Sequence, residues 1–179
     1  MGEEAAQWLS EFLGRPCRLV RSHERFFRCM PPEAAHLFLR RQRRYPDCAP
    51  IHLISRASLD ALNRRLAAPL EMSRFRPNLV VEGIGPFEED RLRSIRIGGI
   101  VLEYMGLAER CVIPTIAPAT AERSAEPLRT LRGFRHLADG FYTRLAFGTY
   151  FQPTEIGVLR VGDGIEVLSV GQAPELRSY

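Results

Sequence analysis

Two stretches of the chain repeat apolar residues with the period of an α-helix. Residues 3–13 carry one apolar stripe, begin with two glutamates, and are followed by Gly14, a residue typical of helix ends. The stripe consists of Ala5, Trp8, Leu9, Phe12 and Leu13. The second stretch starts near Ser55 and Ser58, either of which can cap a helix, and repeats leucines as far as Leu66. We therefore expect one helix at the start of the chain and one in the middle.

The other apolar runs are short and separated by turn residues, which is typical of β-strands. Strands are predicted at 17–20, 51–54, 79–81, 95–97, 100–105, 147–151, 157–161 and 165–168. Gly98-Gly99 predicts a hairpin between two of them, and Gly162-Asp163-Gly164 predicts a second hairpin. Strands and helices do not alternate as they do in a parallel sheet. The predicted fold is therefore α+β and mainly β, a β-barrel with peripheral helices.

Between these elements lie stretches without either period. Residues 22–46 mix arginines and aromatic residues and predict an excursion over the surface, with one helical turn near 33–39. The Pro/Ala/Ser-rich stretch 117–127 predicts a loop, and one or two helical turns are expected at 128–134. The chain then divides into an N-terminal helix and connecting segment (1–46), a barrel domain (47–170) and a flexible tail (171–179).

Composition places the chain among ordinary globular domains. Of its 179 residues, 45% are apolar and 26% charged, which is enough for one domain with a real core. All 25 basic residues are arginine, and the net charge of +4 permits an anionic ligand. The arginine cluster at 40–44 could contact a phosphate or RNA, but a solvated face is the favoured interpretation, so nucleic acid is not an expected partner.

Cysteine usage and hydropathy bear on the compartment. The four cysteines are scattered, with no Cys-x-x-Cys motif, which argues against a zinc site and a disulfide scaffold and fits a reducing environment. No apolar run approaches the roughly 20 residues of a membrane span, and no signal peptide is recognised. We therefore expect a cytoplasmic protein without a membrane partner.

Cys111 is the main candidate for chemistry. It lies where an apolar run, 100–107, gives way to a loop, so a thiol there is held rigidly and can be reached. Arg110 beside it would favour the thiolate, which is the nucleophilic and metal-binding form. The alternative is a cysteine that only packs in the core. His52, inside a predicted strand, is interpreted as a core or edge residue and not as a metal ligand.

A second candidate is the pair Arg76 and Asn78, which flanks Pro77 at the start of a predicted strand. Proline pushes the residue before it toward an extended conformation, so both side chains would point in defined directions. Such a pair suits an anionic or heterocyclic group. The alternative is an arginine paired with a nearby carboxylate and an asparagine turn.

Several motifs occur together in one order, and their combination resembles a known family. The motifs are DCAPIHLISRASLDALNRRL (47–66), RFRPNLVVEG (74–83), IRIGGIVLE (95–103), ERCVIPT (109–115), FGTYF (147–151) and LRVGDGIEVL (159–168). The chain is similar to MOSC-domain proteins, and within them to the mitochondrial amidoxime reducing component and its bacterial relatives. It resembles the part that follows their N-terminal β-rich half, and the resemblance implies a MOSC-type β-barrel.

The resemblance implies a molybdenum–molybdopterin cofactor with Cys111 as the thiolate ligand of the metal; no pyridoxal phosphate is expected. It implies further cofactor contacts at Asp47, Arg76, Asn78, Arg110, Thr115 and Tyr150. The activity implied is two-electron reduction of N-hydroxylated small molecules at molybdenum, with electrons from a separate donor protein.

The loop after the cysteine departs from the family's pattern and keeps a second function open. The family commonly continues with Thr-Thr and then Asp-Pro-x-Thr-Gly, whereas this chain reads Pro114-Thr115 and then IAPATA (116–121). Loss of an aspartate near a metal site can weaken metal binding. The alternative is a divergent MOSC module without catalysis, which binds a partner or carries the cofactor.

Overall fold

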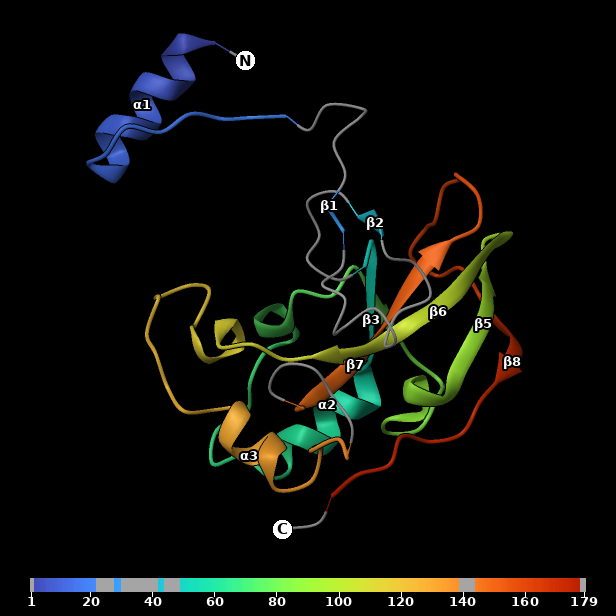
Figure 1. The fold of residues 1–179 in the computed structure, drawn as a ribbon. Helices are drawn as coiled ribbons and strands as arrows, with labels where there is room; N and C mark the ends of the chain where they lie inside the picture. The colour runs from blue at the N-terminus through green and yellow to red at the C-terminus, as the bar shows by residue number, and fades with distance from the viewer. Residues whose placement is uncertain (1, 22–27, 30–41, 44–48, 139–143, 178–179) are drawn as a thin grey trace.

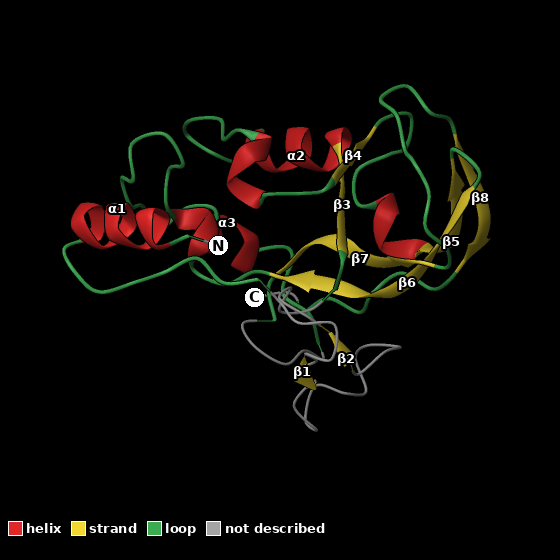
Figure 2. Cartoon of the chain, turned by 90° about the horizontal axis from the view of Figure 1, so that it is seen from above, coloured by secondary structure: helices red, strands yellow, loops and turns green. Residues whose placement is uncertain are grey.

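The computed structural model of this protein describes residues 2–21, 28–29, 42–43, 49–138 and 144–177. Its centre is a six-stranded sheet in the order β4-β3-β7-β6-β5-β8, which curls into a half-barrel (Figures 1 and 2). The strands are β3 (Ile51–Ser55), β4 (Leu79–Val81), β5 (Leu92–Ile97), β6 (Ile100–Glu109), β7 (Ala146–Pro153) and β8 (Ile165–Val170). Two further strands, β1 (Arg28–Cys29) and β2 (Gln42–Arg43), pair with each other. The predicted mainly-β, α+β fold is confirmed.

The described residues also form three α-helices and three 3-10 helices. The α-helices are α1 (Glu3–Leu13), α2 (Arg56–Asn63) and α3 (Leu128–Arg132), and the 3-10 helices are η2 (Met72–Phe75), η3 (Glu88–Arg91) and η4 (Ile113–Thr115). Ser55 caps α2 by accepting a hydrogen bond from the Ser58 N–H, as its sequence suggests. The helical turns predicted at 128–134 correspond to α3.

The first predicted hairpin is present, and its turn has the expected backbone. Gly98 and Gly99 join β5 to β6 with φ angles of 54° and 86°. Positive φ at both central residues is the condition for a turn whose twist matches two antiparallel strands, and glycine meets it without steric cost. The two glycines of the turn therefore allow β5 and β6 to pair as a hairpin.

The second predicted hairpin is wrong. Residues 157–161 form no strand, and β8 pairs antiparallel with β5 instead. The chain does turn at these residues, because the Asp163 carboxylate accepts a hydrogen bond of 2.7 Å from the Arg160 N–H. That turn packs against the other hairpin, where a Cβ on Gly98 would lie 2.6 Å from the Asp163 carboxylate. The turn thus leads the chain into β8, which pairs with β5 and not with residues 157–161.

The sheet contains one parallel strand-helix-strand unit, which the sequence analysis did not predict. β3 and β4 run parallel, with Leu53 opposite Leu79 and Ser55 opposite Val81, and α2 lies in the connection between them. A parallel pair needs such a crossover because its two strands start at the same edge of the sheet. The sequence predicted each of the three elements but not the pairing of the strands.

The N-terminal helix follows its sequence prediction in bounds but not in environment. Gly14 ends α1 in the left-handed conformation, with φ of 64°. None of its residues is buried, and the rings of Trp8 and Phe12, 62% and 74% exposed, stack on each other with centroids 5.4 Å apart. In Figure 1 the helix lies apart from the sheet. Residues 17–20, predicted as a strand, are irregular.

Alternation along β3 supplies two apolar clusters, since successive side chains of a strand point to opposite faces. Leu53 belongs to a cluster between the strands, and Ile54 belongs to one that includes residues of α2 and α3. The first consists of Leu53, Val81, Leu92, Ile95, Ile97, Ile100, Leu102 and Phe151. The second consists of Ile54, Leu59, Leu62, Phe75, Leu131, Leu145 and Phe147. β3 is therefore fixed from both sides.

The segment after Val170, expected to be flexible, makes backbone hydrogen bonds. The Gly171 N–H donates to the Arg91 carbonyl at 2.7 Å, and the Arg177 N–H donates to the His136 carbonyl at 2.8 Å. The connecting segment 22–48 lies outside the described residues apart from β1 and β2, so the helical turn predicted near 33–39 has no counterpart to compare.

Candidate functional site

Cys111 lies where the sequence places it, at the end of a strand. β6 ends at Glu109, and the Arg110 N–H still donates to the Leu145 carbonyl at 2.8 Å, which holds the chain up to the residue before the cysteine. Cys111 itself is exposed and has a free thiol. A rigid strand thus presents a reachable sulfur atom, and the alternative of a cysteine packed in the core is excluded.

The turn that follows Cys111 is closed by Thr115. The Thr115 hydroxyl donates to the Val112 carbonyl at 2.7 Å, and its N–H donates to the same oxygen at 3.0 Å. Its own carbonyl accepts from the Ser124 N–H at 3.0 Å, which ties the turn to the loop that comes back. Thr115 is buried, so these bonds fix the shape of the turn that carries the thiol.

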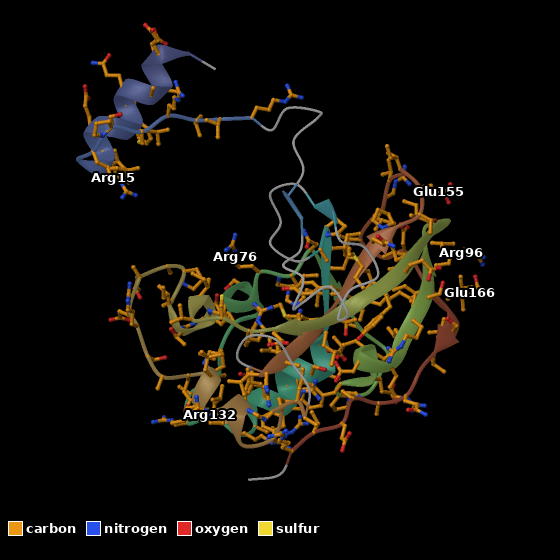
Figure 3. All side chains as sticks on the ribbon, in the orientation of Figure 1. Arg15, Arg76, Arg96, Arg132, Glu155 and Glu166 are labelled. Atoms are coloured by element: carbon orange, nitrogen blue, oxygen red, sulfur yellow. The ribbon has the colours of Figure 1, made fainter. Side chains whose placement is uncertain are left out.

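Arg76 differs from its predicted conformation. Pro77 was expected to make it extended, but its φ of 53° and ψ of 48° are left-handed. The reason is that Arg76 ends η2, where its N–H donates to the Ser73 carbonyl at 3.2 Å. A non-glycine residue in this conformation carries backbone strain. The side chain points outward and is exposed (Figure 3).

Asn78 is bonded on both sides to one residue of β3. Its N–H donates to the His52 carbonyl at 2.8 Å, and its side-chain Oδ1 accepts from the His52 N–H at 2.8 Å. The bond to Oδ1 occupies the oxygen of the side-chain amide, and the backbone bond continues the parallel pairing of β3 and β4 by one residue. The Nδ2 group, a donor, has no hydrogen-bond acceptor among the described residues and belongs to an exposed residue.

The segments that carry Arg76 and Cys111 lie side by side. η2 contacts η4, and the Arg74 guanidinium donates to the Pro114 carbonyl at 3.4 Å. An outward arginine and a free thiol, separated by 35 positions in the sequence, therefore belong to one surface region.

Arg110 points inward. Only 8% exposed, it has Nη1 3.3 Å from His52 Nε2, and Nη2 donates to the Phe75 carbonyl at 3.0 Å. The guanidinium also lies over the Phe75 ring, 5.8 Å from its centroid. This side chain thus connects the end of β6 with β3 and with η2. Its effect on the thiolate of Cys111 stays a prediction.

His52 is the centre of these contacts. The ring is buried, and burial together with the nearby Arg110 lowers its pKa to about 3, although backbone carbonyls of Phe147, Arg76 and Phe75 act in the opposite direction. The ring is therefore neutral at physiological pH. Nε2 has two polar neighbours at 3.3 Å, the Arg110 guanidinium, which donates, and the Phe147 carbonyl, which accepts, so the tautomer of the ring decides which of the two contacts is a hydrogen bond.

Tyr150 and Gly148 pack against the same histidine from β7. Tyr150 is the antiparallel partner of His52, and the two rings lie 5.4 Å apart. Gly148 has a φ of 87°, and a Cβ at this position would come within 2.5 Å of His52 Nε2. Glycine at 148 therefore leaves the space that the imidazole needs to reach Arg110.

Comparison with known proteins agrees with the resemblance seen in the sequence motifs. The family model described as "MOSC domain" matches residues 40–166. The chain belongs to the MOSC domain family. It is 39% identical over 176 residues to mitochondrial amidoxime reducing component 2 of Rattus norvegicus, which covers 92% of this chain and 51% of that relative. It is 35% identical over 175 residues to mitochondrial amidoxime-reducing component 1 of Homo sapiens, at 93% and 52% coverage.

A third relative, mitochondrial amidoxime-reducing component 1 of Mus musculus, is 36% identical over 175 residues, which is 93% of this chain and 51% of the relative. The chain thus spans about half the length of the curated relatives it matches. The matched MOSC region contains the whole of the site described above, from His52 to Tyr150.

The MOSC fold brings most of the predicted site residues into one region. Arg76, Asn78, Arg110 and Tyr150 share contacts with His52 or with its backbone. Thr115 belongs to the Cys111 turn. Asp47 and the side chains of the arginine cluster at 40–44 lie outside the described residues.

The part of His52 in this MOSC site was missed by sequence reasoning. The histidine was correctly predicted to be a core or edge residue, but its bonds to both candidate segments were not foreseen. The available signal was an imidazole inside the apolar run 51–54, because a polar group on a buried strand requires a hydrogen-bond partner. The partner itself depends on tertiary contacts between residues 58 positions apart.

Proposed function

We propose that this chain binds a molybdenum–molybdopterin cofactor and acts in two-electron reduction at the metal, with Cys111 as the protein ligand of molybdenum. The observation that carries the proposal is the exposed thiol of Cys111 at the end of a strand, on a turn that contacts the segment before Arg76 and Asn78. When bound, the cofactor would supply a metal that cycles between oxidation states two electrons apart.

The side chains present fit such a group. A soft thiolate suits a soft transition metal. No group of three or more His, Cys, Asp or Glu residues within the described ranges could hold a metal ion, so a metal here would depend on the ligands of a cofactor besides Cys111. Arg76 supplies an outward positive charge for an anionic group, and Asn78 Nδ2 supplies a neutral donor.

The other predicted residues take supporting parts. Thr115 closes the turn that carries the thiol, and Tyr150 packs beside His52. Arg110, the residue before the proposed ligand, is held by its hydrogen bond to the Phe75 carbonyl. Asp47 remains a proposed cofactor contact. The Glu109 carboxylate, which could repel an anionic cofactor, accepts a hydrogen bond from the Arg144 N–H at 3.0 Å.

The substrate class and the electron source follow from the relatives. Their names describe reduction of amidoximes, which are N-hydroxylated compounds, and we extend this substrate class to the chain. The electrons would come from a separate donor protein. No helix within the described ranges is long and apolar enough to cross a membrane. The cytoplasmic location stays a prediction, since the relatives are named as mitochondrial.

The experiment is a measurement of molybdenum and pterin in the full chain, purified from cells able to make molybdopterin. We expect about one of each per chain, and loss of the molybdenum in Cys111→Ser. Cys17→Ser is the matched control, because Cys17 is a free, partly exposed cysteine outside the site. Wild-type molybdenum content in Cys111→Ser would refute the ligand assignment.

The alternative is a MOSC module that carries the cofactor or binds a partner without turnover. One observation favours it: the loop after Thr115 departs from the family's pattern. A chain that retains molybdenum but does not reduce benzamidoxime with a chemical electron donor would support this alternative.

A further inference from the structure

We propose that His52 is a positioning residue, which holds the Cys111 turn and the Arg76–Asn78 segment in a fixed relation to each other. The consequence for a cofactor rests on the function proposed above. The contacts that support the inference are all between residues of this chain and do not involve a cofactor. Three connections of His52, one through its ring and two through its backbone, make the case.

The ring connection leads to the Cys111 turn. His52 Nε2 lies 3.3 Å from Arg110 Nη1, and Arg110 is the residue that directly precedes Cys111. The backbone N–H of Arg110 is held at the same time by the Leu145 carbonyl at 2.8 Å. With both its backbone and its side chain bonded, Arg110 sets the direction in which the chain leaves β6.

The backbone connections lead to the other segment. The N–H and the carbonyl of His52 bond to the side chain and to the N–H of Asn78, both at 2.8 Å. Arg110 reaches this segment too, because its Nη2 donates to the Phe75 carbonyl at 3.0 Å. The contacts of His52, Arg110 and the segment 75–78 thus form a closed loop. This loop includes the backbone of Arg76 and Asn78, two of the three exposed residues of the proposed site.

The surroundings leave the imidazole little freedom to take another position. Phe147 contributes a carbonyl 3.3 Å from Nε2, Tyr150 packs on the ring, and Gly148 passes so close that it has no room for a Cβ. A buried guanidinium that loses the imidazole beside it has to find another polar partner or shift. Removal of the imidazole should therefore loosen both segments together and leave distant strands unchanged.

The test is backbone amide hydrogen exchange in the full chain without cofactor, for wild type and His52→Leu. We expect exchange about tenfold faster in residues 74–79 and 109–115, the effect of losing one buried hydrogen bond, and unchanged exchange in the β5–β6 hairpin. His52→Gln, which keeps a terminal acceptor, should return both segments close to wild-type rates. Leu53→Val, next to His52 on the opposite face of β3, is the control for general weakening of the strand.

A double variant tests whether His52 acts through Arg110. In an Arg110→Met background, His52→Leu should produce no further increase in exchange at 109–115. Unchanged exchange in His52→Leu, or an equal increase in the β5–β6 hairpin, would overturn the proposal. Failure of His52→Gln to restore the rates would overturn it as well.

A second measurement connects the inference to the cofactor. His52→Leu should lose molybdenum during gel filtration faster than wild type, and His52→Gln should not. If the wild-type chain contains no molybdenum, the proposed function fails, while the exchange experiment still decides whether His52 positions the two segments. The two failures are therefore distinguishable.

Discussion

Asp90 and Arg135 form an enclosed ion pair, with 2% and 3% of their side chains exposed. The Arg135 guanidinium also donates to the Ala146 carbonyl at 3.1 Å and lies over the Phe87 ring, 4.5 Å from its centroid. Next to the pair is Glu89, fully buried, whose Oε1 accepts from the Ser55 N–H at 3.1 Å. One arginine thus shares a buried site with two carboxyl groups.

The first prediction concerns pH. Burial raises the pKa of Asp90 from 3.8 to about 6, although Arg135 lowers it. A pKa that is higher in the folded state means that ionisation of this group opposes folding. The cost, on the order of 3 kcal/mol, is present above pH 6 and disappears as the pH falls toward 4. Urea unfolding across this range should show the trend in wild type and not in Asp90→Asn. Parallel pH profiles for the two proteins would contradict the assignment.

The second prediction concerns the partner of that carboxylate. Arg135→Met leaves Asp90 and Glu89 without the buried positive charge and should destabilise the chain by about 3–5 kcal/mol at pH 7.5. The loss should be smaller at pH 5, where Asp90 is protonated. Arg96→Met is the matched control, because the ion pair of Arg96 with Glu166 is exposed (Figure 3) and should contribute less than about 1 kcal/mol. Equal losses in the two variants, measured by urea unfolding, would contradict this account.

The third prediction separates the stability cost of a strained backbone conformation from the cost of a steric clash. Gly148 and Gly99 have nearly the same φ, 87° and 86°, but only Gly148 has neighbours where a Cβ would be. Gly99→Ala should therefore cost about 1–2 kcal/mol, the conformational term alone. Gly148→Ala should cost at least about 2 kcal/mol more, because the new methyl group meets His52 Nε2 and the Leu53 carbonyl. Similar losses for both variants in urea unfolding would show that His52 can move aside.

The fourth prediction uses the strain at Arg76. Glycine accepts a φ of 53° freely, so Arg76→Gly should raise the stability by about 0.5–1 kcal/mol while it removes the outward charge. The melting temperature should rise and molybdenum retention should fall. Ala121→Gly is the control, because Ala121 has a φ of 59° and is exposed in the loop 117–127, so it should gain stability without a change in retention. Full retention by Arg76→Gly would remove this residue from the site.

Local chemistry explains which parts of the fold could be predicted. Gly98-Gly99, Gly14 and the Ser55 cap each act within a few residues of their own position, so the sequence alone is sufficient to place a turn or a helix end. The Gly162-Asp163-Gly164 turn was also placed correctly. The strand that follows it nevertheless pairs with β5, because the choice among strands depends on the edge that β5 leaves available.

In the candidate site, too, local features could be predicted and those that depend on tertiary contacts could not. Cys111 could be placed at the end of a strand from the change in composition around it, and its exposure agrees with that position. The inward direction of Arg110 could not be predicted, because it depends on the His52 ring of β3 and on the carbonyl of Phe75. Arg76 was given the wrong backbone because the local preference imposed by Pro77 is weaker than the hydrogen bond that closes η2.

The position of Trp8 decides which spectroscopic signal reports on folding. It is the only tryptophan of the chain, and it stacks on Phe12 of α1, a helix without buried residues. Its fluorescence will respond to fraying of that helix and not to the loss of the sheet that carries Cys111. Unfolding followed by tryptophan emission and unfolding followed by the far-UV signal of the strands should therefore give different midpoints in the same sample.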